Sequence, residues 1–437
     1  MYKRILSLLL AVVLAAALCS CGEEKKETLT VEVTEGAAES TEAFLTVETT
    51  AIDNTKGYEY NNPRHCYQVL PLDSQRELYE LLYDNFRDIS AEKDEESGYY
   101  PMPQVKIDAS LSEAQVRTVI KAIYNDYPEL FWAAGTIGFY SDEEVTIVRM
   151  YSSYSPEEVD EMSQSILDAV ADFLSGLIEG LPEYELELKA HDYLLKRAEY
   201  DEDVDKENTK NNDPNIYTAY GPLVNRIAVC EGYARAYQLL MNNVGLDCVG
   251  ISGMGNEDLH MWNAVNLGGE WYLVDPTWDD HEEPCFHYDY FNLTTEQMNR
   301  DHTPSPMFDE LTDDEINGDS GKFNCDVMNM FVPVCTDPTM GYYWRSCPWL
   351  SDYDGSDILE PLYKAALNRE EQFMFYVDES LDFYETLELL FSEKPQYFFG
   401  YVENINNRLP DYSIDTSNIG YVYVDKCRVV TVELNYL

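Results

Sequence analysis

The amino-acid sequence predicts a fold that mixes helices with strands joined by hairpins, and two observations support this. Apolar residues recur at three-to-four spacing in several stretches, for example after Asp73 and after Ser112, as on the buried face of a helix. Elsewhere, short alternating or apolar runs are bounded by Gly and Asp, which is typical of strands joined by hairpins. A length of 437 residues corresponds to about two to four domains.

Residues 1–20 have the pattern of a signal peptide. Lys3 and Arg4 precede a run of apolar or small residues that ends at Leu18, and this run is shorter than the about 20 apolar residues that a membrane span needs. Cys21 follows in a context that resembles a bacterial lipobox, in which the cysteine is acylated and becomes the mature N-terminus. We therefore expect a lipid anchor at Cys21 and a location on the outer face of the cytoplasmic membrane. Plain secretion after cleavage near Ala17 is the alternative.

Composition and patterning divide the next parts of the chain. Residues 21–57 are rich in Glu, Thr and Ala and poor in apolar side chains, so we expect a disordered acidic linker. Residues 58–180 form the predicted N-terminal accessory domain, and residues 181–321 hold the motifs described below. The elements expected here are helices beginning near Asp73, Ser112 and Ser155, two strands between Ile137 and Met150, and a helix from Glu183 to about Tyr200.

Residues 322–437 combine a connector with a small predicted α/β domain. Its expected elements are helices at Ile358–Leu367 and Ser380–Phe391, a strand at Phe373–Val377 and a final hairpin from Tyr421 to Val432. The segment 352–357 superficially resembles a calcium loop, but Gly355 is misplaced, so we expect a surface turn.

The chain is strongly acidic, with 82 Asp and Glu against 29 Lys and Arg and a formal net charge of −53. A protein that neutralises phosphates needs clustered Lys and Arg, so the composition argues against a nucleic-acid partner. It also argues against direct binding to anionic lipids, so any membrane attachment is expected to come from the lipid anchor.

Cys230 stands at the start of a predicted helix. The residues that follow recur at helical spacing from Tyr233 to Val244, and Gly245 ends the pattern. The backbone N–H groups and the dipole at a helix start favour the thiolate, which is the nucleophilic form of cysteine. A single cysteine in such a place is more often a small buried residue, so a functional interpretation needs partners.

Two partners are predicted on a hairpin further along the chain. An alternating run and an apolar run flank Gly268 and Gly269, and a two-residue turn at these glycines would place Trp262 opposite Asp275. His260, two residues from Trp262, then lies on the diagonal from Asp275 at roughly 7 Å between Cβ atoms, within reach of a hydrogen bond. A loop one residue longer or shorter would reverse the faces and break this geometry.

A thiol, an imidazole and a carboxylate in this arrangement fit nucleophilic catalysis. His260 would take the proton of the Cys230 thiol and return it to the leaving amine, and Asp275 would orient the imidazole. The backbone N–H of Cys230 would hold part of the developing oxyanion. Spacing alone leaves this arrangement and a structural interpretation equally open.

Three segments resemble the motifs of the transglutaminase-like superfamily, and they occur in the same chain order. They are Ala228–Tyr237, His260–Val265 and Trp271–Asp280, and the resemblance extends over roughly Glu183 to Thr303. It implies a papain-like α+β core, with the nucleophile helix packed on an antiparallel sheet, and a triad of Cys230, His260 and Asp275. It further implies thiol acyl transfer without a metal or organic cofactor. The second oxyanion donor of the family lies upstream of the nucleophile; Tyr220 is our candidate, and a packed aromatic at a loop end is the alternative.

The expected function is that of a surface lipoprotein that attacks an amide carbonyl through Cys230 and forms a thioester. Water as the acceptor would make it a protease, peptidase or deamidase, and a Lys amine would make it a crosslinking enzyme. Bacterial proteins similar to this chain are described as candidate cysteine proteases, which favours hydrolysis. The expected partner is a protein or peptide substrate, with a cell-wall peptide as one option.

Competing interpretations stay open. The chain could be a non-catalytic binding or scaffold module that keeps the fold, or a polysaccharide binder that uses its 35 Tyr residues. His281, Cys285 and His287 lack the spacing of a zinc site, so no metal is expected. His191 and His302 are interpreted as ordinary histidines. After Cys19, Cys21 and Cys230 are set aside, an odd number of cysteines is left, so at least one thiol is expected to be free.

Overall fold

The computed structural model describes residues 58–204, 212–256, 258–280, 288–316 and 328–437. The leader, Cys21, the linker and the boundary expected at 321/322 lie outside the described residues, as do His281, Cys285 and His287. Internal contacts divide the chain into two compact units. The first is Met1–Asn263 with Pro304–Val332, and the second is Ala264–Thr303 with Pro333–Leu437.

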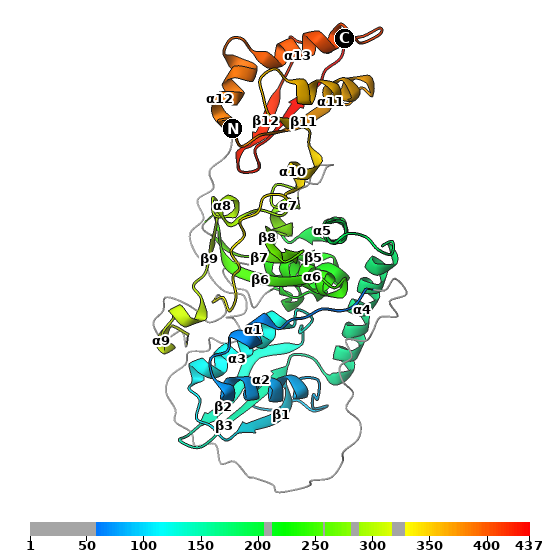
Figure 1. Ribbon diagram of the computed structural model, residues 1–437. Coiled ribbons are helices and arrows are strands. Elements are labelled where there is room, and N and C mark those ends of the chain that lie inside the picture. The colour runs from blue at the N-terminus through cyan, green and yellow to red at the C-terminus, as the bar shows by residue number, and fades with distance from the viewer. Residues whose placement is uncertain (1–57, 205–211, 257, 281–287, 317–327) are drawn as a thin grey trace. The chain divides into compact units, whose positions relative to one another are not determined.

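The first unit begins with helices beside a three-stranded antiparallel sheet, in the order β1-β3-β2. The helix expected after Ser112 is present, because the Ser112 hydroxyl accepts from Gln115 N (3.2 Å) and the Gln115 side chain accepts from Ser112 N (2.8 Å). Helix α2 packs against β1 and α3 (Figure 1). It buries Leu78 and Leu82. The elements are α1 (His65–Val69), α2 (Asp73–Asn85), β1 (Tyr100–Ile107), α3 (Glu113–Asp126), β2 (Ala133–Ser141), β3 (Thr146–Ser152) and α4 (Pro156–Ser175).

The rest of the first unit leads the chain to Cys230. Its elements are α5 (Glu183–Arg197), β4 (Glu199–Tyr200), η3 (Pro214–Tyr217), η4 (Gly221–Asn225), β5 (Ile227–Ala228), α6 (Cys230–Asn243), β6 (Asp247–Gly255), η5 (Phe308–Glu310) and α9 (Asp313–Ile316). Short parallel pairing of β4 with β5 brings Tyr200 beside Ala228, two residues before the helix that starts at Cys230. Helix α6 packs on α5 and on β6, and Gly245 follows it with a φ of 84°.

Strand β7 (Asp258–Leu267) belongs to a four-stranded sheet with the order β8-β7-β6-β9, in which β8 is Glu270–Val274 and β9 is His302–Pro304. The division between the two units falls within β7. Together with the helices, this sheet confirms the α+β class expected from the sequence.

The second unit holds another four-stranded sheet, with the order β10-β11-β13-β12. Strands β10 and β11 are parallel and the other pairs are antiparallel. Its core is aliphatic and aromatic, with Phe375, Phe398 and Val430 wholly buried, and α11 contacts both β11 and α13 (Figure 1). The elements are α7 (Pro276–Asp279), α8 (Thr295–Met298), α10 (Tyr342–Ser346), β10 (Trp349–Leu350), α11 (Ser356–Leu367), β11 (Gln372–Val377), α12 (Phe383–Leu387), η7 (Glu388–Ser392), α13 (Tyr397–Asn406), β12 (Tyr421–Val424), η8 (Asp425–Cys427) and β13 (Val429–Glu433).

Most elements expected in the second unit are present with small differences in their ends. The helix expected from Ser380 begins three residues later, because the Asp382 side chain accepts from Glu385 N and caps α12. The final hairpin pairs Tyr421 with Val432, and the short turn η8 connects its strands. The segment at Asp352 is a turn before α11, as expected.

Candidate active site

Cys230 is the first residue of α6, and its side chain is partly buried. The residue before it, Val229, cannot cap the helix with its side chain, and its backbone N–H donates to the carbonyl oxygen of Ile216 (3.1 Å). The helix start at Cys230 therefore presents backbone N–H groups and the positive end of the dipole without a side-chain cap, which suits a thiolate or an oxyanion.

Gly232 explains how the start of α6 lies so close to the preceding chain. A Cβ on Gly232 would lie 2.3 Å from the carbonyl oxygen of Ile216 and 2.9 Å from the Cβ of Ala228. Only glycine fits there without moving the backbone. The motif that carries Cys230 thus needs its glycine for packing.

Two tyrosines lie around Cys230 in the first unit. Tyr217 and Val229 share a small apolar cluster, and Tyr200 packs against it. Burial raises the pKa of Tyr200, and the next largest cause is the charge of Cys230. Burial also raises the pKa of Tyr217 to about 12. A hydrogen bond from Asn212 lowers this pKa, and the charges of Glu231, Asp201 and, least of these, Cys230 raise it. Both hydroxyls are therefore protonated at neutral pH and able to donate a hydrogen bond.

Tyr220, the oxyanion donor expected from the sequence, lies directly before η4. Its ring packs against that of Phe131, with 5.7 Å between centroids, and its backbone N–H donates to the Thr218 hydroxyl. This packing agrees with the alternative of an aromatic at a loop end. A catalytic role for Tyr220 stays a prediction, and Tyr200 and Tyr217 are candidates that sequence reasoning missed.

His260 lies on β7, partly exposed, and on the same face as Trp262; their ring centroids are 6.2 Å apart with 21° between the planes. Strand β7 ends at Leu267 and β8 begins at Glu270, so the expected two-residue loop is present. Both loop residues have positive φ, 64° at Gly268 and 98° at Gly269, as a type I′ turn requires.

Asp275 directly follows β8 and caps helix α7. Its side chain is wholly buried. One carboxylate oxygen, Oδ1, accepts from the backbone N–H groups of Thr277 (3.0 Å) and Trp278 (3.3 Å). The other, Oδ2, lies 3.1 Å from Nε2 of His302. The carboxylate is therefore held on both oxygens, as a group that orients another side chain should be.

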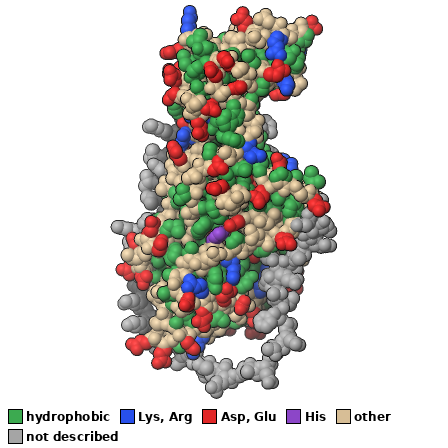
Figure 2. Space-filling model, in the orientation of Figure 1, with side chains coloured by type: hydrophobic (Ala, Val, Ile, Leu, Met, Phe, Trp, Pro, Cys, Tyr) green, Lys and Arg blue, Asp and Glu red, His purple; other side chains and the backbone are tan. Residues whose placement is uncertain are grey.

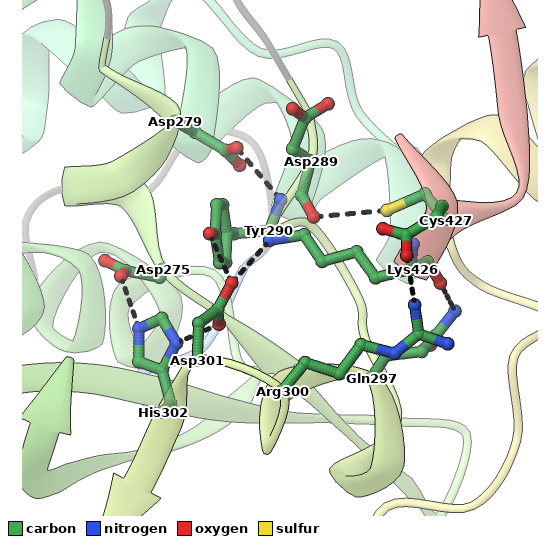
Figure 3. Close-up of polar contacts among 11 residues, drawn as sticks. Asp275, Asp279, Asp289, Tyr290, Gln297, Arg300, Asp301, His302, Lys426 and Cys427 are labelled. Carbon is green, nitrogen blue, oxygen red and sulfur yellow. Dashed lines mark hydrogen bonds and ion pairs between the residues drawn. The ribbon is translucent and has the colours of Figure 1, made fainter. Parts of the chain in front are cut away.

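His302 resembles an ordinary histidine in the sequence, but the structure pairs it with Asp275. It begins β9, and its ring is buried between Asp275 on one side and Asp301 on the other (Figure 3). Nδ1 of His302 lies 2.7 Å from Oδ1 of Asp301. No spacing signal predicts this pair, because 27 residues separate Asp275 from His302.

Cys230 differs from the other cysteines of the described part of the chain. All six there are free thiols, and the other five are buried. Burial raises the pKa of Cys335 and of Cys347 to about 12, and it also raises the pKa of Cys66, Cys248 and Cys427. A water-soluble thiol reagent should therefore distinguish Cys230 from these five side chains.

The visible face in Figure 2 carries Asp and Glu side chains over much of its described surface, whereas Lys and Arg are fewer and scattered. No helix of the described residues is both long and apolar enough to span a membrane.

Comparison with known families places this geometry in context. Residues 176–276 match the family model Transglut_core, described as the transglutaminase-like superfamily. The match includes Cys230, His260 and Asp275. This segment of the chain is therefore similar to the transglutaminase-like superfamily, and the observed α+β fold agrees with that similarity.

Similarity to individual proteins is confined to parts of the chain. Kyphoscoliosis peptidase of Mus musculus is 36% identical over 61 residues, and that of Homo sapiens is 34% identical over 61 residues. Each match covers 11% of this chain and 9% of the relative, so the chain spans less than a tenth of these curated relatives.

Two solved structures also match part of the fold. One, described as a TGase, is 12% identical with a TM-score of 0.24 and covers 40% of this chain and 51% of that chain. A candidate cysteine protease from Cytophaga hutchinsonii is 14% identical with a TM-score of 0.21 and covers 32% of this chain and 61% of that chain.

Proposed function

We propose that this protein is a thiol enzyme of the transglutaminase-like type, which attacks an amide carbonyl through Cys230. The observation that carries the proposal is a partly exposed thiol at the uncapped start of α6, within a segment that matches the family. The family match alone would also suit a binding module. A module that only binds, however, has no need for a partly exposed thiol at a helix start when the five other described cysteines are buried.

The proposed triad consists of Cys230, His260 and Asp275. The two-residue loop at Gly268 and Gly269 supports this triad, because the loop length determines which side chains of β7 and β8 lie on the same face of the sheet. Continued along the hairpin, that register puts Asp275 across from Trp262 and on the diagonal from His260. The buried carboxylate of Asp275, which caps α7, would then hold the His260 ring in one orientation.

In the proposed reaction, His260 accepts the thiol proton while the sulfur of Cys230 bonds to the amide carbon. The carbonyl oxygen becomes an oxyanion that receives hydrogen bonds from the Cys230 backbone N–H and from a tyrosine hydroxyl. We favour Tyr200 for this second donor, because it pairs with Ala228, two residues before Cys230, and packs against the cluster that contains Val229. Collapse of the intermediate breaks the carbon–nitrogen bond, and His260 gives its proton to the leaving amine.

The resulting thioester then transfers its acyl group to water, and His260 removes the proton of the attacking water molecule. The products are a carboxylic acid and the free Cys230 thiol. An amine acceptor in place of water would give a new amide and make the protein a crosslinking enzyme. We favour hydrolysis, which agrees with the peptidase name of the curated relatives.

We also propose a lipid anchor at Cys21, which would hold the enzyme at the cell surface. Proteins or peptides outside the cytoplasmic membrane, including cell-wall peptides, would then be its substrates. Labelling with a radioactive fatty acid, compared between the wild type and Cys21→Ala, tests this point. Absence of label in the wild type would contradict the anchor.

The proposed reaction is tested by trapping the thioester. The purified protein is incubated with peptide mixtures or cell-wall extract, quenched in acid, and digested for mass spectrometry of the Cys230 peptide. We expect an acyl adduct on Cys230 in the wild type and none in Cys230→Ala. A protein that binds the peptides but never forms an adduct would instead be the scaffold module.

A further inference from the structure

His302 lies between two carboxylates in the interior of the second unit (Figure 3). Nε2 of His302 is 3.1 Å from Oδ2 of Asp275, and Nδ1 is 2.7 Å from Oδ1 of Asp301. The side chains of His302 and Asp275 have no exposed surface. Both ring nitrogens therefore face a carboxylate oxygen at hydrogen-bond distance, out of contact with bulk water.

The donors around these carboxylates determine where the proton resides. Oδ1 of Asp275 accepts two backbone N–H bonds, which favours the ionised carboxylate. Burial raises the pKa of Asp301, but the hydrogen bond from His302, the charge of Lys426 and the hydrogen bond from Tyr290 together lower this pKa below its usual range. An ionised carboxylate has no hydrogen to donate, so each of these two contacts is a hydrogen bond only where the ring nitrogen of His302 carries the hydrogen.

The cluster is completed by a side chain from the C-terminal hairpin. Nζ of Lys426 lies 3.3 Å from Oδ2 of Asp301, and the Tyr290 hydroxyl donates to the same oxygen (2.8 Å). Lys426 is 7% exposed, and its Nζ lies 2.9 Å from the centroid of the Tyr290 ring. Lys426 thus brings a positive charge against Asp301, where burial leaves little water to solvate the carboxylate. A buried carboxylate needs such a partner.

Hydrogen bonds and an ion pair hold the C-terminal hairpin in place. The Gln297 side chain donates to the carbonyl oxygen of Lys426 (2.9 Å), and the Cys427 thiol donates to the carbonyl oxygen of Asp289 (3.2 Å) (Figure 3). Arg300 forms an ion pair with Asp425 (3.4 Å). The turn η8 is therefore fixed to the segment that carries Asp301 and His302.

We propose that His302 is a positioning residue of the triad, and that Lys426 makes the C-terminal hairpin a part of this positioning machinery. The charged ring of His302 holds the Asp275 carboxylate in the one orientation from which it can serve His260. Lys426 neutralises Asp301 and so lets His302 keep its proton. This inference rests on the proposed function, since it assigns Asp275 the orienting role in the triad.

The first test reads the charge of His302 and does not depend on catalysis. The Cys230→Ala protein is labelled with ¹⁵N-histidine, and its ring nitrogens are recorded by NMR at pH 7. The resonances of His302 are those that disappear in His302→Gln. We expect both of its nitrogens in the range of protonated N–H groups, and one nitrogen in the range of an unprotonated imidazole would overturn the inference.

The second test measures the rate constant for alkylation of Cys230 by iodoacetamide at pH 7. We expect His302→Gln to lower it by about tenfold, the loss seen when a group that orients a catalytic ligand is removed. Lys426→Met should give a smaller loss, and Lys426→Arg should restore the rate because it keeps the charge. Because Lys426→Met leaves His302 in place, it serves as the test if His302→Gln does not fold.

His65→Gln is the matched control, because it removes a different histidine–carboxylate pair. Nε2 of His65 lies 2.8 Å from Oδ2 of Asp247 in the first unit. This variant should be alkylated at the wild-type rate. Folded Lys426→Met or His302→Gln protein that also reacts at the wild-type rate would overturn the inference about positioning. A wild-type Cys230 that reacts no faster than in His260→Ala would instead overturn the proposed function, while the NMR result would still stand.

Discussion

Oδ2 of Asp275 lies 3.1 Å from Nε2 of His302, while Oδ1 of the same carboxylate caps helix α7. One buried side chain thus stabilises a helix and pairs with a histidine. The pairing also ties Asp275 to the segment that follows β8 and, through Asp301, to Lys426 in the C-terminal hairpin. Changes at Asp275 should therefore affect both stability and reactivity.

Asp275→Asn should reduce reactivity while it keeps the cap of α7. Asparagine keeps an oxygen that can cap α7, but it loses the charge that orients and stabilises an imidazolium. By analogy with other triads, hydrolysis of p-nitrophenyl acetate should fall by about 10³- to 10⁴-fold. Both variants remove the carboxylate that faces His302, but Asp275→Ala also removes the cap of α7, so its free energy of unfolding should be lower than that of Asp275→Asn by about 0.5–2 kcal/mol. Urea unfolding of both variants measures the difference, and equal stability of the two would contradict the account.

Gly232→Ala should displace the start of α6. A Cβ at this position would lie 2.3 Å from the carbonyl oxygen of Ile216, so the backbone has to move, at a cost of about 1–3 kcal/mol. Because Cys230 is two residues away, its alkylation by iodoacetamide should slow as well. Gly400→Ala in α13 is the control: a Cβ at Gly400 would meet no atom within 4 Å, and alanine favours a helix by about 0.5–1 kcal/mol. Thermal unfolding that ranks the two variants in the opposite order would refute this packing argument.

Asp301 should make stability depend on acid pH. Its pKa in the folded protein is lowered, despite burial, by His302, Lys426 and Tyr290. A lowered pKa stabilises the folded state above the unfolded value of about 3.9, and this contribution is lost as the pH falls through the folded pKa. Asp301→Asn should therefore be less stable than the wild type at pH 7, with the difference shrinking below about pH 4. Urea midpoints at pH 7 and pH 3 test this; a difference that grows towards pH 3 would have the wrong sign.

Tyr200→Phe should separate oxyanion stabilisation from thiol reactivity. If the hydroxyl donates to the oxyanion, its removal should lower turnover of p-nitrophenyl acetate by about 10²- to 10³-fold. Alkylation of Cys230 by iodoacetamide forms no oxyanion, so that rate should change little. Tyr217→Phe is the matched comparison from the same cluster. A parallel loss in both assays would assign Tyr200 a role in packing.

The hairpin of β7 and β8 was predictable because its geometry is encoded locally. Gly268 and Gly269 are the residues that positive φ angles allow without strain, and the runs on either side have the strand pattern. Helix α3 was predictable for the same kind of reason, since Ser112 and Gln115 form a capping box within four residues.

Other parts depend on contacts that no local pattern shows. Strand β6 contains three glycines and is buried on both faces, so it lacks the alternation by which a strand is recognised. The Asp301–Lys426 ion pair joins residues 125 positions apart, and Lys426 looks like an ordinary turn residue in the sequence. The sequence could therefore indicate the nucleophile and its hairpin, but not the groups that hold Asp275.

The most direct measurement of the central claim is the second-order rate constant for alkylation of Cys230 by iodoacetamide at pH 7, in the wild type and in His260→Ala. The five buried cysteines of the described residues should stay unlabelled in the native protein, so the label reports on Cys230 among these six. We predict a wild-type rate well above that of an ordinary thiol and a return to the ordinary rate in His260→Ala. Equal, slow rates in the two proteins would contradict a thiol enzyme built on Cys230 and His260.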